Sequence, residues 1–190
     1  MASDYSAKLS RRSILGAFAA VPVISAAPYY ANAAGHIRGA GDVRRIRLSN
    51  SRTTESIDAV YWIEGEYLEP VLKEISFFMR DWRRNAIMDY DRNNIDIIAA
   101  THRLLDVDEP FQLLSGYRTA ATNAMLKSRG YGVASNSYHM KAMAADLRLR
   151  NRSTAQMSSA AIACSSGGVG RYRRSNFIHI DSGPIRQWNG

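Results

Sequence analysis

The segment Phe177-Ile178-His179-Ile180-Asp181 alternates apolar and polar side chains near the C-terminus, which predicts a strand with one face in the core. Residues 142–149 (Ala-Met-Ala-Ala-Asp-Leu-Arg-Leu) alternate in the same way and predict a second strand. On each strand the larger apolar side chains share one face, and Asp146, His179 and Asp181 lie on the opposite face. If the two strands are neighbours, Asp146 and His179 converge on one site.

His139 directly follows a loop at residues 129–138 that is rich in Gly, Ser, Asn and Tyr. From there its side chain can reach the site that Asp146 and His179 share. Imidazole nitrogen and carboxylate oxygen are ligands of catalytic zinc, which keeps one position open for water. The His-x6-Asp…His pattern therefore predicts a metal site, although its spacing alone fits a pair of structural histidines equally well.

The rest of the chain mixes strands and helices without a regular strand–helix–strand rhythm, which is typical of an α+β fold. Short-range alternation predicts strands at residues 43–48 and 57–62 around a polar turn, and a buried strand at residues 111–115. Apolar side chains at helical spacing predict helices at residues 67–79, 94–105, 120–128 and 154–165. The run Gly167-Gly168-Val169-Gly170 predicts a turn before the last strand.

The first 33 residues are typical of an export signal. Arg11 and Arg12 precede an apolar stretch, and Ala31-Asn32-Ala33 matches a signal-peptidase site. The twin arginines favour the twin-arginine (Tat) route to the periplasm. An uncleaved membrane anchor is the alternative, but the apolar stretch is short for a membrane span. We expect a signal peptide at residues 1–33, a flexible leader at 34–42 and one domain at 43–190.

The formal net charge is +8, of which the predicted signal contributes +2, so the domain itself is basic. Its basic residues are scattered and form no recognisable nucleic-acid-binding motif, which argues against a nucleic-acid partner. Anionic cell-wall polymer suits an exported basic protein better. Cys164 is the single cysteine, so no disulfide can form within the chain, and we expect its side chain to be a small buried apolar group.

Two histidines and the tryptophans lie outside the predicted metal site. His102 stands in a Thr-His-Arg run on a predicted helix, where we expect it to be exposed, and His36 falls in the leader. Trp62, Trp82 and Trp188 are more often core or rim aromatics than platforms for sugar stacking.

Taken together, these residues resemble the M15 family of zinc peptidases, in its exported YcbK-like branch. The resemblance extends from about residue 43 to Trp188. It rests on ordered motifs at compatible spacings: Tyr61-Trp62-x-x-Gly65-x-Tyr67, Arg80-Asp81, Ser115-Gly116-Tyr117-Arg118 with Asn123, Ser137-Tyr138-His139 with Ala144 and Asp146, Gly167-Gly168-Val169-Gly170-Arg171-Tyr172, and Phe177-Ile178-His179-Ile180-Asp181. It implies the fold of Hedgehog and D-Ala-D-Ala peptidase domains, a small and mostly antiparallel sheet with flanking helices.

The resemblance implies one zinc ion per chain, bound by His139, Asp146 and His179. It also implies hydrolysis of D,D- or L,D-peptide bonds in peptidoglycan, as an endopeptidase or a carboxypeptidase. Asp181 lies two residues from His179 on the same strand face. It can act either as the group that transfers the proton to the leaving amine or as a partner that orients His179.

Arg118 follows the end of a predicted strand and a glycine turn. Its guanidinium can bind a substrate carboxylate or a developing oxyanion there; a surface ion pair with a structural acid is the alternative. We expect Ser137 and Tyr117 of the same motifs to contact the substrate as well.

Ala142 departs from the family pattern, which usually has glycine three residues after the motif histidine. If the backbone needs a positive φ there, alanine is strained. This departure supports the competing hypothesis of a catalytically inactive peptidoglycan-binding or scaffold protein on the same fold.

Overall fold

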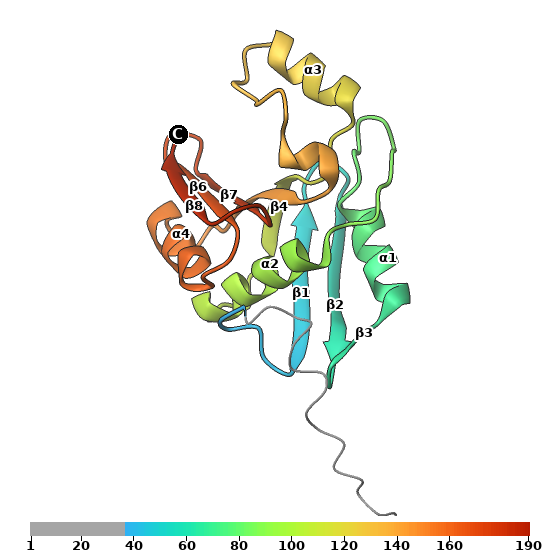
Figure 1. Ribbon diagram of the computed structural model, residues 1–190, viewed down its shortest axis with the longest axis vertical. Coiled ribbons are helices and arrows are strands. Elements are labelled where there is room, and N and C mark those ends of the chain that lie inside the picture. Colours follow the sequence, from blue (N-terminus) through green and yellow to red (C-terminus); the bar gives the residue numbers. More distant parts are fainter. Residues whose placement is uncertain (1–36) are drawn as a thin grey trace, which may run out of the picture. The chain divides into compact units, whose positions relative to one another are not determined.

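The computed structural model describes residues 37–190, so the predicted signal peptide and His36 lie outside the described residues. The strands are β1 (Val43–Asn50), β2 (Glu55–Ile63), β3 (Glu66–Tyr67), β4 (Phe111–Ser115), β5 (Ala144–Arg148), β6 (Gly168–Tyr172), β7 (Phe177–Asp181) and β8 (Arg186–Asn189) (Figure 1). The helices are α1 (Glu69–Phe78), α2 (Arg92–Leu105), α3 (Ala120–Ser128), the 3₁₀ helix η1 (Tyr138–Lys141) and α4 (Thr154–Ala163). No helix within residues 37–190 combines the length and apolar character that crossing a membrane would require.

Within the described residues, the strands form one eight-stranded sheet in the order β3-β2-β1-β4-β5-β7-β6-β8. The pairs β1–β4 and β6–β8 are parallel, and the other five neighbouring pairs are antiparallel. The prediction of an α+β fold with a mostly antiparallel sheet is confirmed, and the sheet is larger than expected.

The strands β5 and β7 pair in a register that fixes the predicted site. Asp146 lies directly opposite His179, and the flanking pairs are Ala145 with Ile180 and Leu147 with Ile178. All four flanking side chains are fully buried. Because side chains alternate between the two faces of a strand, Asp146 and His179 lie on the face opposite to this part of the core.

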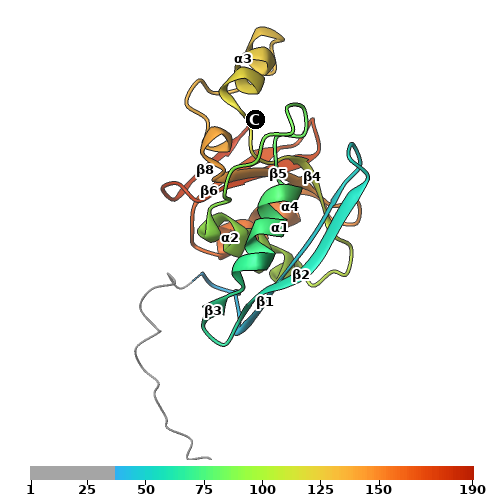
Figure 2. The same cartoon turned by 90° about the vertical axis from the view of Figure 1, so that its right-hand side faces the viewer.

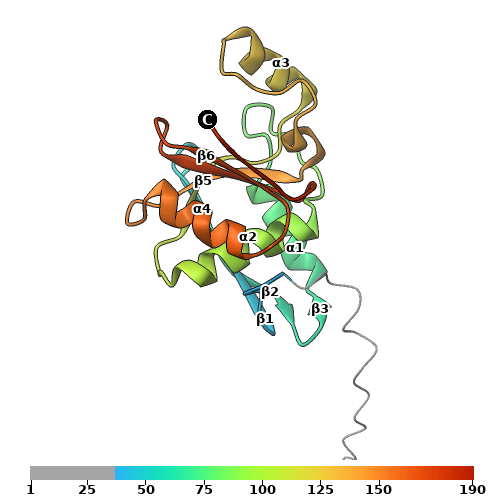
Figure 3. The same cartoon turned by 60° about the vertical axis from the view of Figure 1, so that its left-hand side comes forward.

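Helices α1, α2 and α4 pack against one face of the sheet, as the views in Figure 2 and Figure 3 show. The N-terminus of α2 is capped by Asp91, whose side chain accepts a hydrogen bond from the Asn94 N–H at 2.9 Å. Asn94 in turn donates to the Ile180 carbonyl of β7 at 3.2 Å, so α2 is tied directly to the strand that carries His179.

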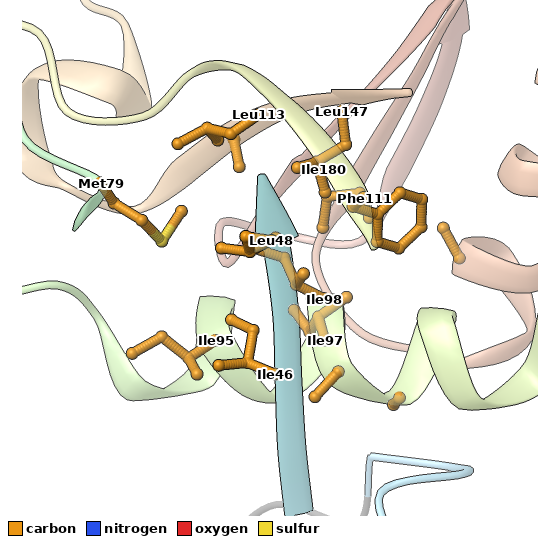
Figure 4. Close-up of a cluster of buried hydrophobic side chains, with 14 of the residues drawn as sticks. Ile46, Leu48, Met79, Ile95, Ile97, Ile98, Phe111, Leu113, Leu147 and Ile180 are labelled. Atoms are coloured by element: carbon orange, nitrogen blue, oxygen red, sulfur yellow. The ribbon is translucent and has the colours of Figure 1, made fainter. Parts of the chain in front are cut away.

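The hydrophobic core lies between α2 and the sheet. Figure 4 shows Ile46 and Leu48 of β1 beside Ile95 and Ile98 of α2, with Phe111 of β4 close by. Each of these side chains is almost completely buried. The burial of a single such side chain stabilises the fold by about 1.5–3 kcal/mol, which makes this layer a rigid base for the opposite face of the sheet.

Most predicted elements are confirmed, and the strand at residues 111–115 and the helix at 120–128 have the predicted bounds. The predicted turn at residues 167–170 is wrong, because Gly168–Tyr172 forms strand β6. A Cβ on Gly168 would clash with the Arg186 side chain, and one on Gly170 would clash with the Trp188 indole. These glycines therefore make room for side chains of β8 rather than for a turn.

Two further expectations are corrected and one is confirmed. His102 is buried rather than exposed, and its Nε2 lies within hydrogen-bond distance of the Glu109 carbonyl oxygen, at 2.8 Å. Ile37 and Ala40, which fall in the expected flexible leader, pack into the core, whereas Arg38, Gly41 and Asp42 are exposed. Cys164 is a buried thiol, as expected.

Candidate metal centre

Three elements bring the predicted metal ligands together: η1 carries His139, β5 carries Asp146 and β7 carries His179. The Nδ1 atom of His179 lies 2.9 Å from Oδ1 of Asp146. The Nε2 atom of His139 lies 3.3 Å from each of these two atoms. One atom of each residue therefore converges on the same point, as the sequence pattern predicted.

The opposite atom of each candidate ligand is held by the protein. His139 Nδ1 lies 2.8 Å from the Gly116 carbonyl oxygen, and this contact requires a proton on Nδ1 and leaves Nε2 free. His179 Nε2 lies 3.0 Å from Oδ2 of Asp181. Asp146 uses Oδ2 to accept a hydrogen bond from Arg118 at 2.8 Å, which leaves Oδ1 for the centre.

This arrangement fits a zinc ion. Two imidazoles and one carboxylate are a known donor set for catalytic zinc, and outer partners normally orient such ligands. Three acceptor atoms that face one another at about 3 Å repel unless a cation or a proton lies between them. The residues that would hold the metal are thus His139, Asp146 and His179.

The turn that carries His139 is fixed at both ends. Ser137 is the N-cap of η1, and its hydroxyl accepts a hydrogen bond from the His139 N–H. Ala142 ends η1 in the left-handed conformation, with φ 52° and ψ 37°. The Arg118 N–H donates to the His139 carbonyl at 3.0 Å, which ties the turn to the segment after β4.

Asp181 is fully buried, and both of its oxygens are occupied. Arg186 of β8 donates two hydrogen bonds to it, at 2.9 and 2.7 Å, and the Gly183 N–H donates a third at 2.8 Å. Asp181 does not line the cavity described below. This environment favours Asp181 as a partner that orients His179 over Asp181 as a proton-transfer group.

The pKa of Asp181 agrees with an orienting role. Burial opposes the ionisation of Asp181, but its hydrogen bonds with His179 and Arg186 lower its pKa to about 2. Such a carboxylate is a weak general base near neutral pH.

The two histidines carry different charges when no metal is bound. Burial disfavours a proton on His179, but its hydrogen bonds with Asp146 and Asp181 outweigh burial and raise its pKa to about 9. Burial lowers the pKa of His139 despite the nearby Asp146 carboxylate. Burial also opposes the ionisation of Asp146, yet the two histidines hold its pKa well below the ordinary value. A metal ion would therefore displace a proton from His179.

Arg118 is almost completely buried, and it contacts the centre directly. Its Nη2 donates to Asp146, and its Nε donates to the Ser115 hydroxyl at 2.8 Å. Sequence reasoning expected Arg118 to bind substrate or to pair with a structural acid; the acid that it meets is a candidate metal ligand.

A cavity of about 580 Å³ opens onto the centre. Its walls include the three candidate ligands together with Arg118 and Ser137. Tyr117 does not line the cavity; its N–H donates to the Met79 carbonyl at 2.8 Å and its side chain packs against the core. The structure thus brings two of the three expected substrate-contacting residues to the cavity.

Two residues at this site were missed by sequence reasoning. Arg186, which holds Asp181, follows the Gly183-Pro184 turn, and Trp188 lies with its ring centroid 5.3 Å from that of His179. The sequence does hold a signal for both residues, because the Gly-x-Gly of β6 leaves room for bulky side chains on a neighbouring strand. This signal can be recognised only once β6 and β8 are known to pair.

Comparisons with known proteins give a consistent result. A family model described as Peptidoglycan L,D-endopeptidase MepK matches residues 38–188. The peptidoglycan L,D-endopeptidase MepK of Escherichia coli (strain K12) is 40% identical over 145 residues, which cover 76% of this chain and 80% of that protein. The probable peptidoglycan L,D-endopeptidase MepK of Haemophilus influenzae is 34% identical over 148 residues, 77% of this chain and 80% of that protein. The matched region contains every residue of the candidate centre.

Proposed function

The chain belongs to the M15 peptidase family, and from this membership we propose that it is a zinc-dependent peptidase that hydrolyses cross-links in peptidoglycan. The observation that carries the proposal is that one ligand atom each of His139, Asp146 and His179 converges on the same point, while the other polar side-chain atom of each residue already has a protein partner. The names of the relatives favour L,D-peptide bonds as the bonds that are cut.

In this proposal one set of residues binds the metal and a second set orients the metal ligands. Zinc held by His139, Asp146 and His179 would supply a Lewis acid for the scissile carbonyl and would activate water for attack. The Gly116 carbonyl and Asp181 fix the histidine tautomers that such binding needs.

Arg118 has two functions in this proposal. It orients Asp146 through Nη2, and it lines the cavity. Among residues 37–190, no partner within hydrogen-bond distance accepts from its Nη1. We propose that this group donates to the substrate carbonyl oxygen as negative charge develops there.

The competing hypothesis of an inactive scaffold depended on Ala142. Its left-handed conformation shows that the turn normally built with glycine is kept, and His139 remains in place. The structure therefore offers no support for a lost centre at this position.

We further propose that the protein acts in the periplasm after export by the twin-arginine route. The sequence Arg11-Arg12 before the apolar stretch supports this proposal. Replacement of both arginines by lysine in a reporter fusion should abolish export; continued export would overturn the route.

The decisive experiment is digestion of purified sacculi by the wild type and by His179→Ala, followed by separation of the muropeptides. We expect new products from the wild type only, and their structures identify the bond that is cut. His102→Gln serves as the matched control, because His102 is a buried histidine outside the centre. Equal profiles for wild type and His179→Ala, or a wild type that takes up no zinc, would contradict the proposal.

A further inference from the structure

The walls of the cavity carry a strong excess of positive charge. Four arginines line it, and among the described residues Asp146 is the single acid that does so. Arg118 is paired with Asp146, and Arg186 is paired with Asp181. The guanidinium groups of the remaining two arginines, Arg52 and Arg83, have no carboxylate within 4.0 Å in the described part of the chain.

Arg52 and Arg83 are nevertheless held in place. The Trp82 ring lies beneath both, with its centroid 4.3 Å from the guanidinium carbon of Arg83 and 5.5 Å from that of Arg52. Arg52 also donates from Nη1 to the Leu114 carbonyl at 3.1 Å. Stacking on an aromatic face restrains a guanidinium and leaves its N–H edges free for an anion.

Both arginines are anchored to the segment that carries Arg118. The Leu114 carbonyl, which holds Arg52, belongs to the residue before Ser115, and Ser115 accepts from Arg118. On the other side, Asp81 binds the N–H of Arg83 and also the N–H and hydroxyl of Thr119, the residue after Arg118. Arg52 and Arg83 thus lie at the end of the cavity next to Arg118.

Two unpaired cations at one cavity wall repel each other, and this cost is relieved when an anion binds between them. Burial together with the positive charge of Arg52 lowers the pKa of Arg83, in agreement with this crowding. The forked geometry of guanidinium matches a carboxylate, which can accept two parallel hydrogen bonds.

We propose that Arg52 and Arg83 form a carboxylate-binding subsite that holds a free carboxylate of the peptidoglycan stem beside the bond that is cut. This inference rests on the proposed function, since it assigns the substrate group that this end of the cavity binds. Besides its C-terminal carboxylate, a stem peptide offers two such groups, the free carboxylate of diaminopimelate and that of D-glutamate, and we assign the subsite to one of these two.

The experiment compares cross-linked muropeptides that differ only in amidation. One substrate keeps both carboxylates, the second is amidated at diaminopimelate and the third at D-glutamate. Binding is measured by titration calorimetry with His179→Ala protein, which is expected not to cleave, and kcat/KM is measured with zinc-loaded wild type. We expect one amidation to weaken binding and lower kcat/KM by about tenfold, which identifies the carboxylate that is bound.

The variants Arg52→Gln and Arg83→Gln should bind the free carboxylate about tenfold more weakly and should no longer distinguish it from the amide. Arg84→Gln is the matched control, because Arg84 is the exposed neighbour of Arg83 and does not line the cavity. Thermal unfolding verifies that each variant is folded.

The two proposals fail in different ways. If wild type cleaves none of the substrates but calorimetry shows the arginine-dependent preference, the peptidase proposal fails and the subsite stands. If neither amidation changes binding, or if Arg52→Gln and Arg83→Gln keep the full preference for the carboxylate, the subsite is overturned whatever the activity.

Discussion

Two aspartates, the buried Asp96 of α2 and the partly buried Asp146 of β5, each pair with a buried arginine, but their surroundings differ in kind. Asp96 accepts hydrogen bonds from Arg44 at 2.5 Å, from the Tyr61 hydroxyl at 2.8 Å and from the Tyr67 hydroxyl at 2.6 Å. Every partner of Asp96 is a donor, so the network is complete without a ligand.

Among the described residues around Asp146, Arg118 is the one fixed donor, and the two histidine rings can each present an acceptor nitrogen to the carboxylate. Arg118 satisfies one oxygen, but the other oxygen faces ring nitrogens of His139 and His179. Only a proton or a metal ion can satisfy three acceptors that converge in this way. The comparison teaches that a carboxylate indicates a functional centre when it faces ring nitrogens that either a proton or a metal ion can occupy, rather than fixed donors alone.

The largest expected effect concerns the hydrogen-bond network around Asp96. Asp96→Asn leaves the Arg44 charge buried without a counter-ion and should lower the free energy of unfolding by about 3–5 kcal/mol. Urea unfolding measures this loss, and Asp58→Asn, which removes an exposed partner of Arg45, should cost less than about 1 kcal/mol. Zinc content and hydrolysis by the folded fraction should be unchanged; loss of zinc would show that the two regions are not independent.

The next largest effect concerns the candidate metal centre around Asp146. Asp181→Asn removes the charged partner of His179 and should weaken zinc binding by about 10–100-fold. Because we assign Asp181 an orienting role, saturating zinc should restore most of the rate. Hydrolysis is therefore measured across a zinc titration, with zinc affinity determined separately by competition with a chelator. A rate that stays low with zinc fully bound would instead identify Asp181 as the proton-transfer group.

How much of this could be read from the sequence depends on whether the signal is local. The convergence of Asp146 and His179 was predictable, since strand alternation is a local pattern and both strands show it. Arg186 was not, because its role depends on the parallel pairing of β8 with β6 across a turn. His102 was misjudged for the same reason: its partners are the Glu109 carbonyl and the Phe111 ring, which only the folded chain brings near.

The glycines of β6 show a case in which a local signal was present but was interpreted wrongly. A run of glycines is usually a turn signal, but in β6 the absence of side chains lets Arg186 and Trp188 cross the strand. Local composition cannot separate these two uses of glycine, since the second depends on a neighbouring strand.

Asp81 tests a third case, a buried carboxylate that is bonded by neutral donors. Burial opposes its ionisation, but hydrogen bonds from Thr119 and from the Arg83 N–H lower its pKa. Because the folded-state pKa is depressed, ionised Asp81 stabilises the fold above the unfolded-state pKa of about 3.9, and this contribution is lost as pH falls through the folded-state pKa.

We therefore expect wild type to be more stable than Asp81→Asn by about 1 kcal/mol near neutral pH. The difference should shrink at acid pH below the unfolded-state value. Urea unfolding at neutral and acid pH measures both differences, and a difference that does not depend on pH would contradict the assignment.

The smallest effect is expected for Ala142→Gly. Glycine relieves a left-handed strain of about 1–2 kcal/mol, but it adds backbone entropy to the unfolded chain and removes a buried methyl group. The net change in the free energy of unfolding should stay within about 1 kcal/mol. Zinc affinity should be unchanged as well; a large gain in zinc affinity for Ala142→Gly would revive the hypothesis of an impaired centre.

The register between β5 and β7 has a practical consequence for preparing the protein. A slip by one residue would turn His179 and Asp181 toward the helices and Ile178 and Ile180 toward water. Core and centre therefore demand the same alignment, and a misaligned molecule can assemble neither. The zinc-to-protein ratio of a sample should then serve as an assay of how many molecules have folded correctly, independent of any substrate.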